Sequence, residues 1–139
     1  MDWSQSYEDT CAELRILQLR EMEVRRMVEL AHKVIVTGEA PSSGDYVHIS
    51  LDKGIERYNQ AVDELDKIQA EVDAKESIKL EMEKAMEQFT GLEHVVKCKV
   101  LQGKSYKVIA EELGYGYQYI RNYMSKRGYK KGTISPKAS

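Results

Sequence analysis

Residues 103–126 read GKSYKVIAEELGYGYQYIRNYMSK, and this stretch decides the fold. A short helix is predicted first, because Ser105 stands where an N-cap residue is preferred and apolar side chains then recur at helical spacing. These apolar side chains are Ile109, Ala110 and Leu113. Gly114 follows at once and can adopt the positive φ that a tight turn between two helices requires. The stretch therefore begins as a helix that ends in a sharp turn.

A second helix is predicted at about 118–127, because Ile120 and Met124 lie one turn apart and can share its inner face. A short helix, a tight turn and a second helix with an inward apolar pair form the plan of a helix-turn-helix. The side chains expected on the outer face of the second helix are Gln118, Tyr119, Arg121, Asn122, Ser125 and Lys126.

The predicted outer face has the chemistry that reads DNA. Arginine can donate two hydrogen bonds to guanine, asparagine and glutamine can pair with adenine, and lysine can meet phosphate. Further basic residues lie at both ends of the motif and are expected to contact the DNA backbone. These are Lys104, Lys107, Arg127, Lys130 and Lys131. The alternative is a bundle corner whose polar side chains are only solvated.

Six of the nine tyrosines lie between residues 103 and 131. A small domain needs large side chains to fill its core. Tyr106, Tyr115, Tyr117 and Tyr123 are therefore expected in the core, whereas Tyr119 is expected to face DNA. A further short helix is predicted at 90–103, ending at Gly103.

Charge separates the two ends of the chain, although its net charge is only −2. Residues 97–139 contain ten Lys or Arg and two Glu, a balance of +8. The first 96 residues contain 11 Lys or Arg and 21 Asp or Glu, a balance of −10. A basic region on an otherwise acidic protein is typical of a module that binds nucleic acid.

The N-terminal part is predicted as two long helices, at about 4–36 and 51–88, joined by a loop around 37–46. The first helix has two apolar stripes set at a wide angle, so it is expected to pack against more than one neighbour. The first stripe contains Tyr7, Leu14, Leu17, Val24, Val28, Ala31 and Ile35. The second contains Ala12, Ile16, Leu19, Met27, Leu30 and Val34. A second copy of the chain is one such neighbour.

These patterns predict an all-α protein, in which a long antiparallel helical hairpin or coiled coil precedes a small helix-turn-helix module. We expect three regions: 1–88 for oligomerisation, 89–131 for DNA binding, and a flexible tail at 132–139. Whether the long helices pair within one chain or between two stays open at this point, and a homodimer is expected.

The C-terminal stretch resembles the fourth conserved region of bacterial sigma factors and the related helix-turn-helix of response regulators. The matching residues are Gly103, Ser105, Tyr106, Ile109, Ala110, Leu113, Gly114 and the pair Ile120-Arg121. Sigma factors usually have Ser or Thr before the recognition helix, whereas Gly116 and Gln118 flank Tyr117 here. With its acidic helical half, the chain is similar to small phage and prophage transcriptional regulators. The resemblance implies sequence-specific recognition of double-stranded DNA, with RNA polymerase as a further candidate partner.

Catalysis and cofactors are not expected, because the sequence lacks a phosphate-binding glycine loop, a plausible Ser/His/Asp arrangement and any metal-ligand spacing. Cys11 and Cys98 are far apart and are expected to be reduced core residues. A cytoplasmic location is expected, because no leader or membrane-spanning segment is predicted.

Two rival functions remain open. One is a coiled-coil adaptor that binds RNA polymerase or another regulator through its helix-turn-helix. The other is the DNA-recognising small subunit of a phage packaging enzyme, which would form a ring of many subunits rather than a dimer.

Overall fold

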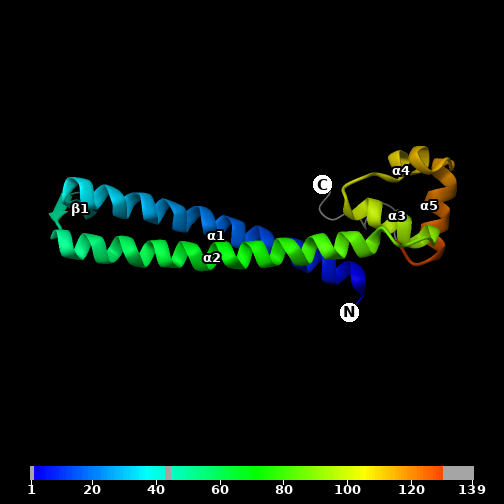
Figure 1. The fold of residues 1–139 in the computed structure, drawn as a ribbon. Coiled ribbons are helices and arrows are strands. Elements are labelled where there is room, and N and C mark those ends of the chain that lie inside the picture. Colours follow the sequence, from blue (N-terminus) through cyan, green and yellow to red (C-terminus); the bar gives the residue numbers. More distant parts are fainter. Residues whose placement is uncertain (1, 43–44, 130–139) are drawn as a thin grey trace. The chain divides into compact units, whose positions relative to one another are not determined.

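The computed structural model describes residues 2–42 and 45–129, and these form five helices and one short β-hairpin (Figure 1). The all-α prediction is confirmed. The helices are α1 (Trp3–Thr37), α2 (Leu51–Met86), α3 (Leu92–Leu101), α4 (Tyr106–Leu113) and α5 (Tyr117–Lys126). The predicted tail at 132–139 lies outside the described residues.

The chain divides into two compact units. The first, called the helical pair, is Thr10–Lys79. The second, called the C-terminal unit, combines the residues up to Asp9 with those from Leu80 onward. The assignment of oligomerisation to residues 1–88 and of DNA binding to residues 89–131 stays a prediction.

Within the helical pair, α1 and α2 run antiparallel in one chain (Figure 1). Their shared core is thin and consists of Leu14, Val24, Ala61, Ile68 and Val72. Ion pairs cross between the two helices at Arg20–Glu64 (3.0 Å) and Glu13–Lys75 (2.8 Å). The first apolar stripe of α1 therefore supplies residues that face α2. Most of the second stripe is exposed to solvent.

The connection between the two long helices is not the irregular loop predicted for residues 37–46. Strands β1 (Glu39–Ser42) and β2 (Asp45–His48) pair antiparallel, with Glu39 opposite His48 and Ser42 opposite Asp45. The pairing satisfies backbone N–H and C=O groups where the chain reverses direction. Composition favoured a loop because Gly, Pro and Ser are common here, but these residues do not exclude a two-stranded hairpin.

In the C-terminal unit, the start of α1 is held by Asp2 and Trp3. The Asp2 carboxylate accepts hydrogen bonds from the backbone N–H of Ser4 (2.6 Å) and of Gln5 (3.2 Å), as an N-cap does. The Trp3 ring lies 4.9 Å from the Phe89 ring and 6.0 Å from the His94 ring. Tyr7, one helical turn after Trp3 in α1, donates a hydrogen bond of 2.7 Å to Glu83. The first helical turns are thereby joined to the segment after residue 80.

Acid is expected to weaken this attachment. The hydrogen bond from the Ser4 hydroxyl, followed by those from the Gln5 and Ser4 backbone, lowers the pKa of Asp2 from 3.8 to about 2. Because the folded pKa is the lower one, the stabilisation is complete above pH 3.8 and is lost as the pH falls toward 2. Trp3 is the only tryptophan. Its fluorescence should therefore change in this pH window, and Asp2→Asn should remove or reduce that change. An unaltered acid transition in Asp2→Asn would contradict the assignment.

Candidate nucleic-acid interface

The core of the C-terminal unit fixes α5 against α4 and α3. Ile109 of α4 and both Ile120 and Met124 of α5 are fully buried, which confirms the predicted inward faces. The same cluster includes Val96, Val100 and Ala110. Burying a large aliphatic side chain stabilises a fold by about 1.5–3 kcal/mol. These few contacts therefore decide which side of α5 faces solvent.

Both ends of α4 have the predicted chemistry. The Ser105 hydroxyl caps α4 by accepting a hydrogen bond from the N–H of Val108 (3.3 Å). Gly114 adopts the left-handed conformation, with φ of 79° and ψ of 23°. The next residue, Tyr115, donates its backbone N–H to the carbonyl of Ala110 (2.9 Å). A tight helix C-cap thus turns the chain toward α5.

The outer face of α5 is largely polar. Its exposed side chains are Gln118, Tyr119, Asn122, Ser125 and Lys126. The Gln118 amide donates a hydrogen bond of 3.1 Å to the Asn122 side-chain oxygen, one turn along the helix. Arg121 is half-buried, at the edge of this face rather than at its centre. The structure thus brings five of the predicted residues onto one accessible surface.

The flanking basic residues differ in how far their charge is already paired. Lys104 lies 2.9 Å from the Glu112 carboxylate, and Lys99 lies at the same distance. The hydrogen bond from Lys99, followed by the one from Lys104, holds the pKa of Glu112 below its ordinary value. By contrast, Lys107 and Lys126 are exposed and have no ion pair among the described residues. They are the stronger candidates for phosphate contacts.

Arg127 is engaged within the unit. Its guanidinium carbon lies 3.5 Å from the centroid of the Tyr123 ring, and its side chain donates to the Tyr123 carbonyl (3.2 Å). It also lies 3.6 Å from Glu93. A phosphate contact by Arg127 would compete with these interactions. Lys130 lies outside the described residues.

The prediction that Tyr115 and Tyr117 fill the core is wrong. They are 44% and 42% exposed, because branched aliphatic residues and Met124 fill the centre of this small core. Tyr106 and Tyr123 do pack against it, as does Tyr129, which the sequence reasoning missed. The exposed Tyr115 and Tyr119 rings stack at 5.1 Å and 14°. Tyr119 in turn lies 6.1 Å from Tyr123.

This row of rings had a sequence signal. Tyr119 and Tyr123 are spaced by four on α5 and Arg127 is its C-cap, so their side chains are neighbours along one side of the helix, while Tyr115 precedes α5. The row continues from Tyr115 through Tyr119 and Tyr123 to the Arg127 guanidinium. It therefore borders the polar face of α5 with an aromatic edge.

Other site types find no support among residues 2–42 and 45–129. None of the helices there is long and apolar enough to cross a membrane. No group of three or more His, Cys, Asp and Glu side chains there has a metal-binding arrangement. Cys98 is buried, and burial raises the pKa of its thiol, whereas Cys11 is half-buried.

No protein-family model, curated protein or solved structure matches the chain. What the C-terminal unit binds must therefore be argued from its own geometry and charge.

Two glycines at the turn allow one substitution to be tested in opposite senses. Gly114→Ser should destabilise the unit by about 1–2 kcal/mol, because a serine must adopt positive φ there. Gly116→Ser should stabilise it by a few tenths of a kcal/mol, roughly 0.3, because Gly116 is the N-cap of α5 and has extended backbone but no side-chain cap. A Cβ at either position meets no atom within 4 Å, so steric crowding contributes to neither change in stability. Equal effects in urea unfolding would contradict the turn geometry.

Tyr106 provides a separate stability test. Its hydroxyl is buried with no hydrogen-bond partner, and burial raises the pKa of Tyr106 to about 12. Tyr106→Phe should therefore leave the free energy of unfolding unchanged or raise it by about 1 kcal/mol. Tyr129→Phe is the matched control, because the Tyr129 hydroxyl donates to Glu93 (3.1 Å) and its removal should be neutral or destabilising. A clear loss of stability in Tyr106→Phe would show that the hydroxyl has a partner.

Proposed function

We propose that the chain is a sequence-specific DNA-binding transcriptional regulator of the phage or prophage type, acting as a homodimer. The observation that carries this proposal is the outer face of α5, held outward by the burial of Ile120 and Met124. In this proposal α5 enters the major groove. An α-helix with its side chains is about 10–12 Å wide, and the major groove of B-DNA is about 12 Å wide.

Asn122 and Gln118 are the proposed base-reading pair. They project from successive turns of α5 and are joined by a hydrogen bond. In this hydrogen bond Asn122 uses its oxygen and Gln118 one N–H, so each amide keeps groups free for a base edge. Paired donor and acceptor groups on an amide match adenine in the major groove. Ser125, one turn beyond Arg121, extends the same reading surface.

Lys107 and Lys126 are the proposed phosphate contacts. Both are exposed and free of ion pairs among the described residues, so neither must break a salt bridge to meet DNA. The balance of +8 over residues 97–139 attracts a polyanion. The balance of −10 over the first 96 residues disfavours DNA binding elsewhere on the chain. Charge therefore supports a single binding region.

A protein-docking role is the second candidate, and one observation favours it. Tyr115, Tyr117 and Tyr119 are each more than 40% exposed, and tyrosine is enriched in protein interfaces. Such a surface suits RNA polymerase or another regulator as a partner. Binding to polymerase without binding to DNA would favour this role. A ring of many subunits would instead favour the small subunit of a packaging enzyme.

Duplex DNA binding over a salt series tests the proposal, once a preferred site has been selected from random sequences. Lys126→Ala should reduce the magnitude of the log–log salt slope by about 0.9, because one phosphate contact is lost. Asn122→Ala should leave that slope unchanged and weaken discrimination by about 1–3 kcal/mol at one base pair. Lys67→Ala, on the exposed surface of α2, is the matched control and should have no effect.

Two outcomes would contradict the proposal. The first is an intact chain that binds no duplex at low salt. The second is an equal loss of binding in Lys67→Ala and Lys126→Ala, which would indicate non-specific attraction to the whole surface.

A further inference from the structure

An apolar stripe on α1 is largely exposed to solvent among the described residues. Ile16, Leu19, Met27 and Leu30 are 65%, 45%, 52% and 49% exposed. At 100° per residue they lie on a different face of α1 from Leu14 and Val24, which face α2, and Met27 is the member nearest to Val24. The central position of this stripe is Glu23. We call the five positions 16, 19, 23, 27 and 30 the outer seam.

The outer seam is symmetric along the helix. Its successive spacings are three, four, four and three residues, so the pattern reads the same in both directions about Glu23. A two-fold axis through Glu23 would place Ile16 opposite the partner's Leu30 and Leu19 opposite the partner's Met27. Isologous dimer contacts require this kind of self-complementarity. Spacings of three and four are also those of packed helix pairs.

The charges of the outer seam fit the same arrangement. Glu23 and Arg26 form no ion pair or side-chain hydrogen bond among the described residues, unlike the adjacent pairs Arg20–Glu64 and Glu21–Arg25. In an antiparallel pair centred on Glu23, the partner's Arg26 lies about one helical turn from Glu23. Each Glu23 would thereby gain an opposite charge, which offsets the approach of the two carboxylates. A parallel pair would instead bring Arg26 against the partner's Arg26.

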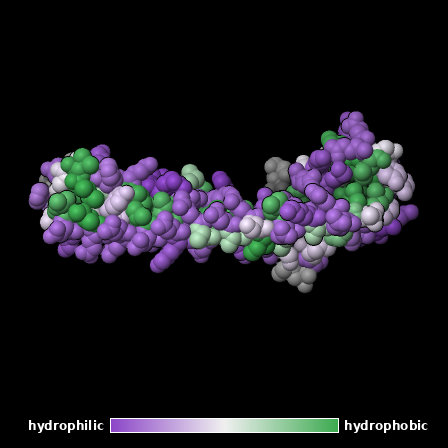
Figure 2. Space-filling view, viewed as in Figure 1, coloured by the Kyte–Doolittle hydropathy of each residue, from purple (hydrophilic) through white to green (hydrophobic). Residues whose placement is uncertain are grey.

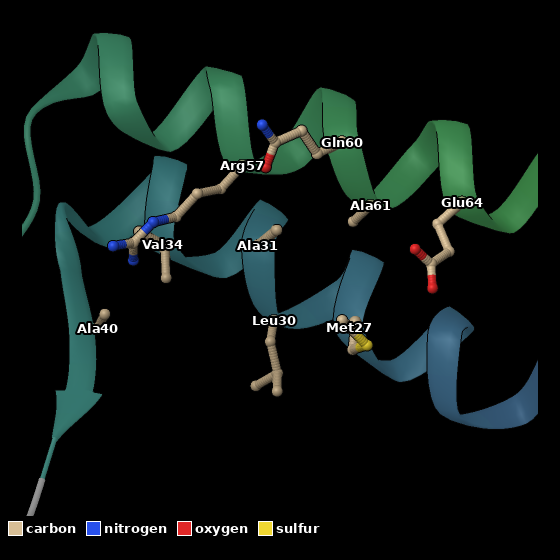
Figure 3. A pocket seen from close by; sticks show the side chains of 9 residues that line it. All are labelled: Met27, Leu30, Ala31, Val34, Ala40, Arg57, Gln60, Ala61 and Glu64. Atoms are coloured by element: carbon tan, nitrogen blue, oxygen red, sulfur yellow. The ribbon is translucent and has the colours of Figure 1, made fainter. Parts of the chain in front are cut away.

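The outer seam continues into a groove between α1 and α2 near the hairpin. This groove has a volume of about 450 Å³ (Figure 3). Its lining is Met27, Leu30, Ala31, Val34, Ala40, Arg57, Gln60, Ala61 and Glu64. In Figure 3 Leu30 points away from α2, while Arg57 and Glu64 extend from α2 toward α1. Apolar side chains also gather at the hairpin end of the helical pair in Figure 2. The groove thus adds an apolar floor and charged edges to the outer seam.

We propose that a second copy of this chain covers the outer seam, with its α1 antiparallel and a two-fold axis at Glu23. Two helical pairs would then form a four-helix bundle whose second apolar layer is the outer seam. Helix bundles commonly complete their core in this way. This dimer surface rests on the proposed function in one respect: it is the surface through which the proposed homodimer would form. The dimer itself can be measured without DNA.

Charge exchange at the outer seam tests the proposal on the intact chain. Glu23→Arg and Arg26→Glu should each raise the monomer–dimer Kd by about tenfold or more, because each places like charges together. The double variant Glu23→Arg/Arg26→Glu should restore dimerisation, because the opposite charges meet again. Leu19→Lys should abolish it, and Leu51→Lys is the control, since Leu51 is also exposed (61%) but lies outside the outer seam. Sedimentation equilibrium measures Kd, and circular dichroism checks that each variant stays helical.

Cysteine cross-linking tests the direction of the two helices. In a background with Cys11→Ser and Cys98→Ala, the pair Ile16→Cys/Leu30→Cys should cross-link between chains, whereas Leu30→Cys alone should not. Cross-linking by Leu30→Cys alone would indicate a parallel pair and overturn the proposal. A monomeric chain, or a dimer that tolerates Leu19→Lys, would overturn it as well. DNA binding by a monomer would leave the proposed reading face intact while refuting this dimer.

Discussion

The packing of Ile120 and Met124 of α5 against Ile109 of α4 is the interaction on which the C-terminal unit depends. All three side chains are fully buried. This contact sets the rotation of α5 about its own axis and therefore decides which residues point outward. The left-handed Gly114 sets the direction in which the chain enters α5. Removing either would leave the polar residues of α5 on one face of a helix, but that face would no longer be held away from the core of the unit.

The helices and the turn of the C-terminal unit were predictable from the sequence, because each follows from the chemistry of neighbouring residues. Ser105 acts through its hydroxyl and Gly114 through its backbone conformation, each within one helical turn, and the Ile120–Met124 spacing fixes a helix face in any context. The hairpin of β1 and β2 was not predictable in this way, because its pairing depends on where the two helices bring the chain. The two apolar stripes on α1 predicted two packing neighbours. In the structure α2 covers the first stripe.

The details of the candidate interface were less predictable. Long side chains choose partners that are distant in sequence, as when Lys104 and Lys99 both meet Glu112. Counting charges cannot separate these paired lysines from the unpaired Lys107 and Lys126. Tyrosines are equally ambiguous, since Tyr123 packs on the core and Tyr115 stacks at the surface. Polar and aromatic residues at a surface can thus be located by spacing, but their roles require the tertiary contacts.

The chain has two surfaces with different chemistry: a basic polar face on α5 and an apolar seam on α1. The proposed function requires that the α5 face contacts duplex DNA. Amide chemical-shift mapping of the intact chain with a DNA duplex tests this most directly, because it observes every part of the chain at once. The largest changes are expected from Gln118 to Lys126 and near Lys107, with little change along α2. Changes concentrated on α1 or α2, with α5 unaffected, would contradict it.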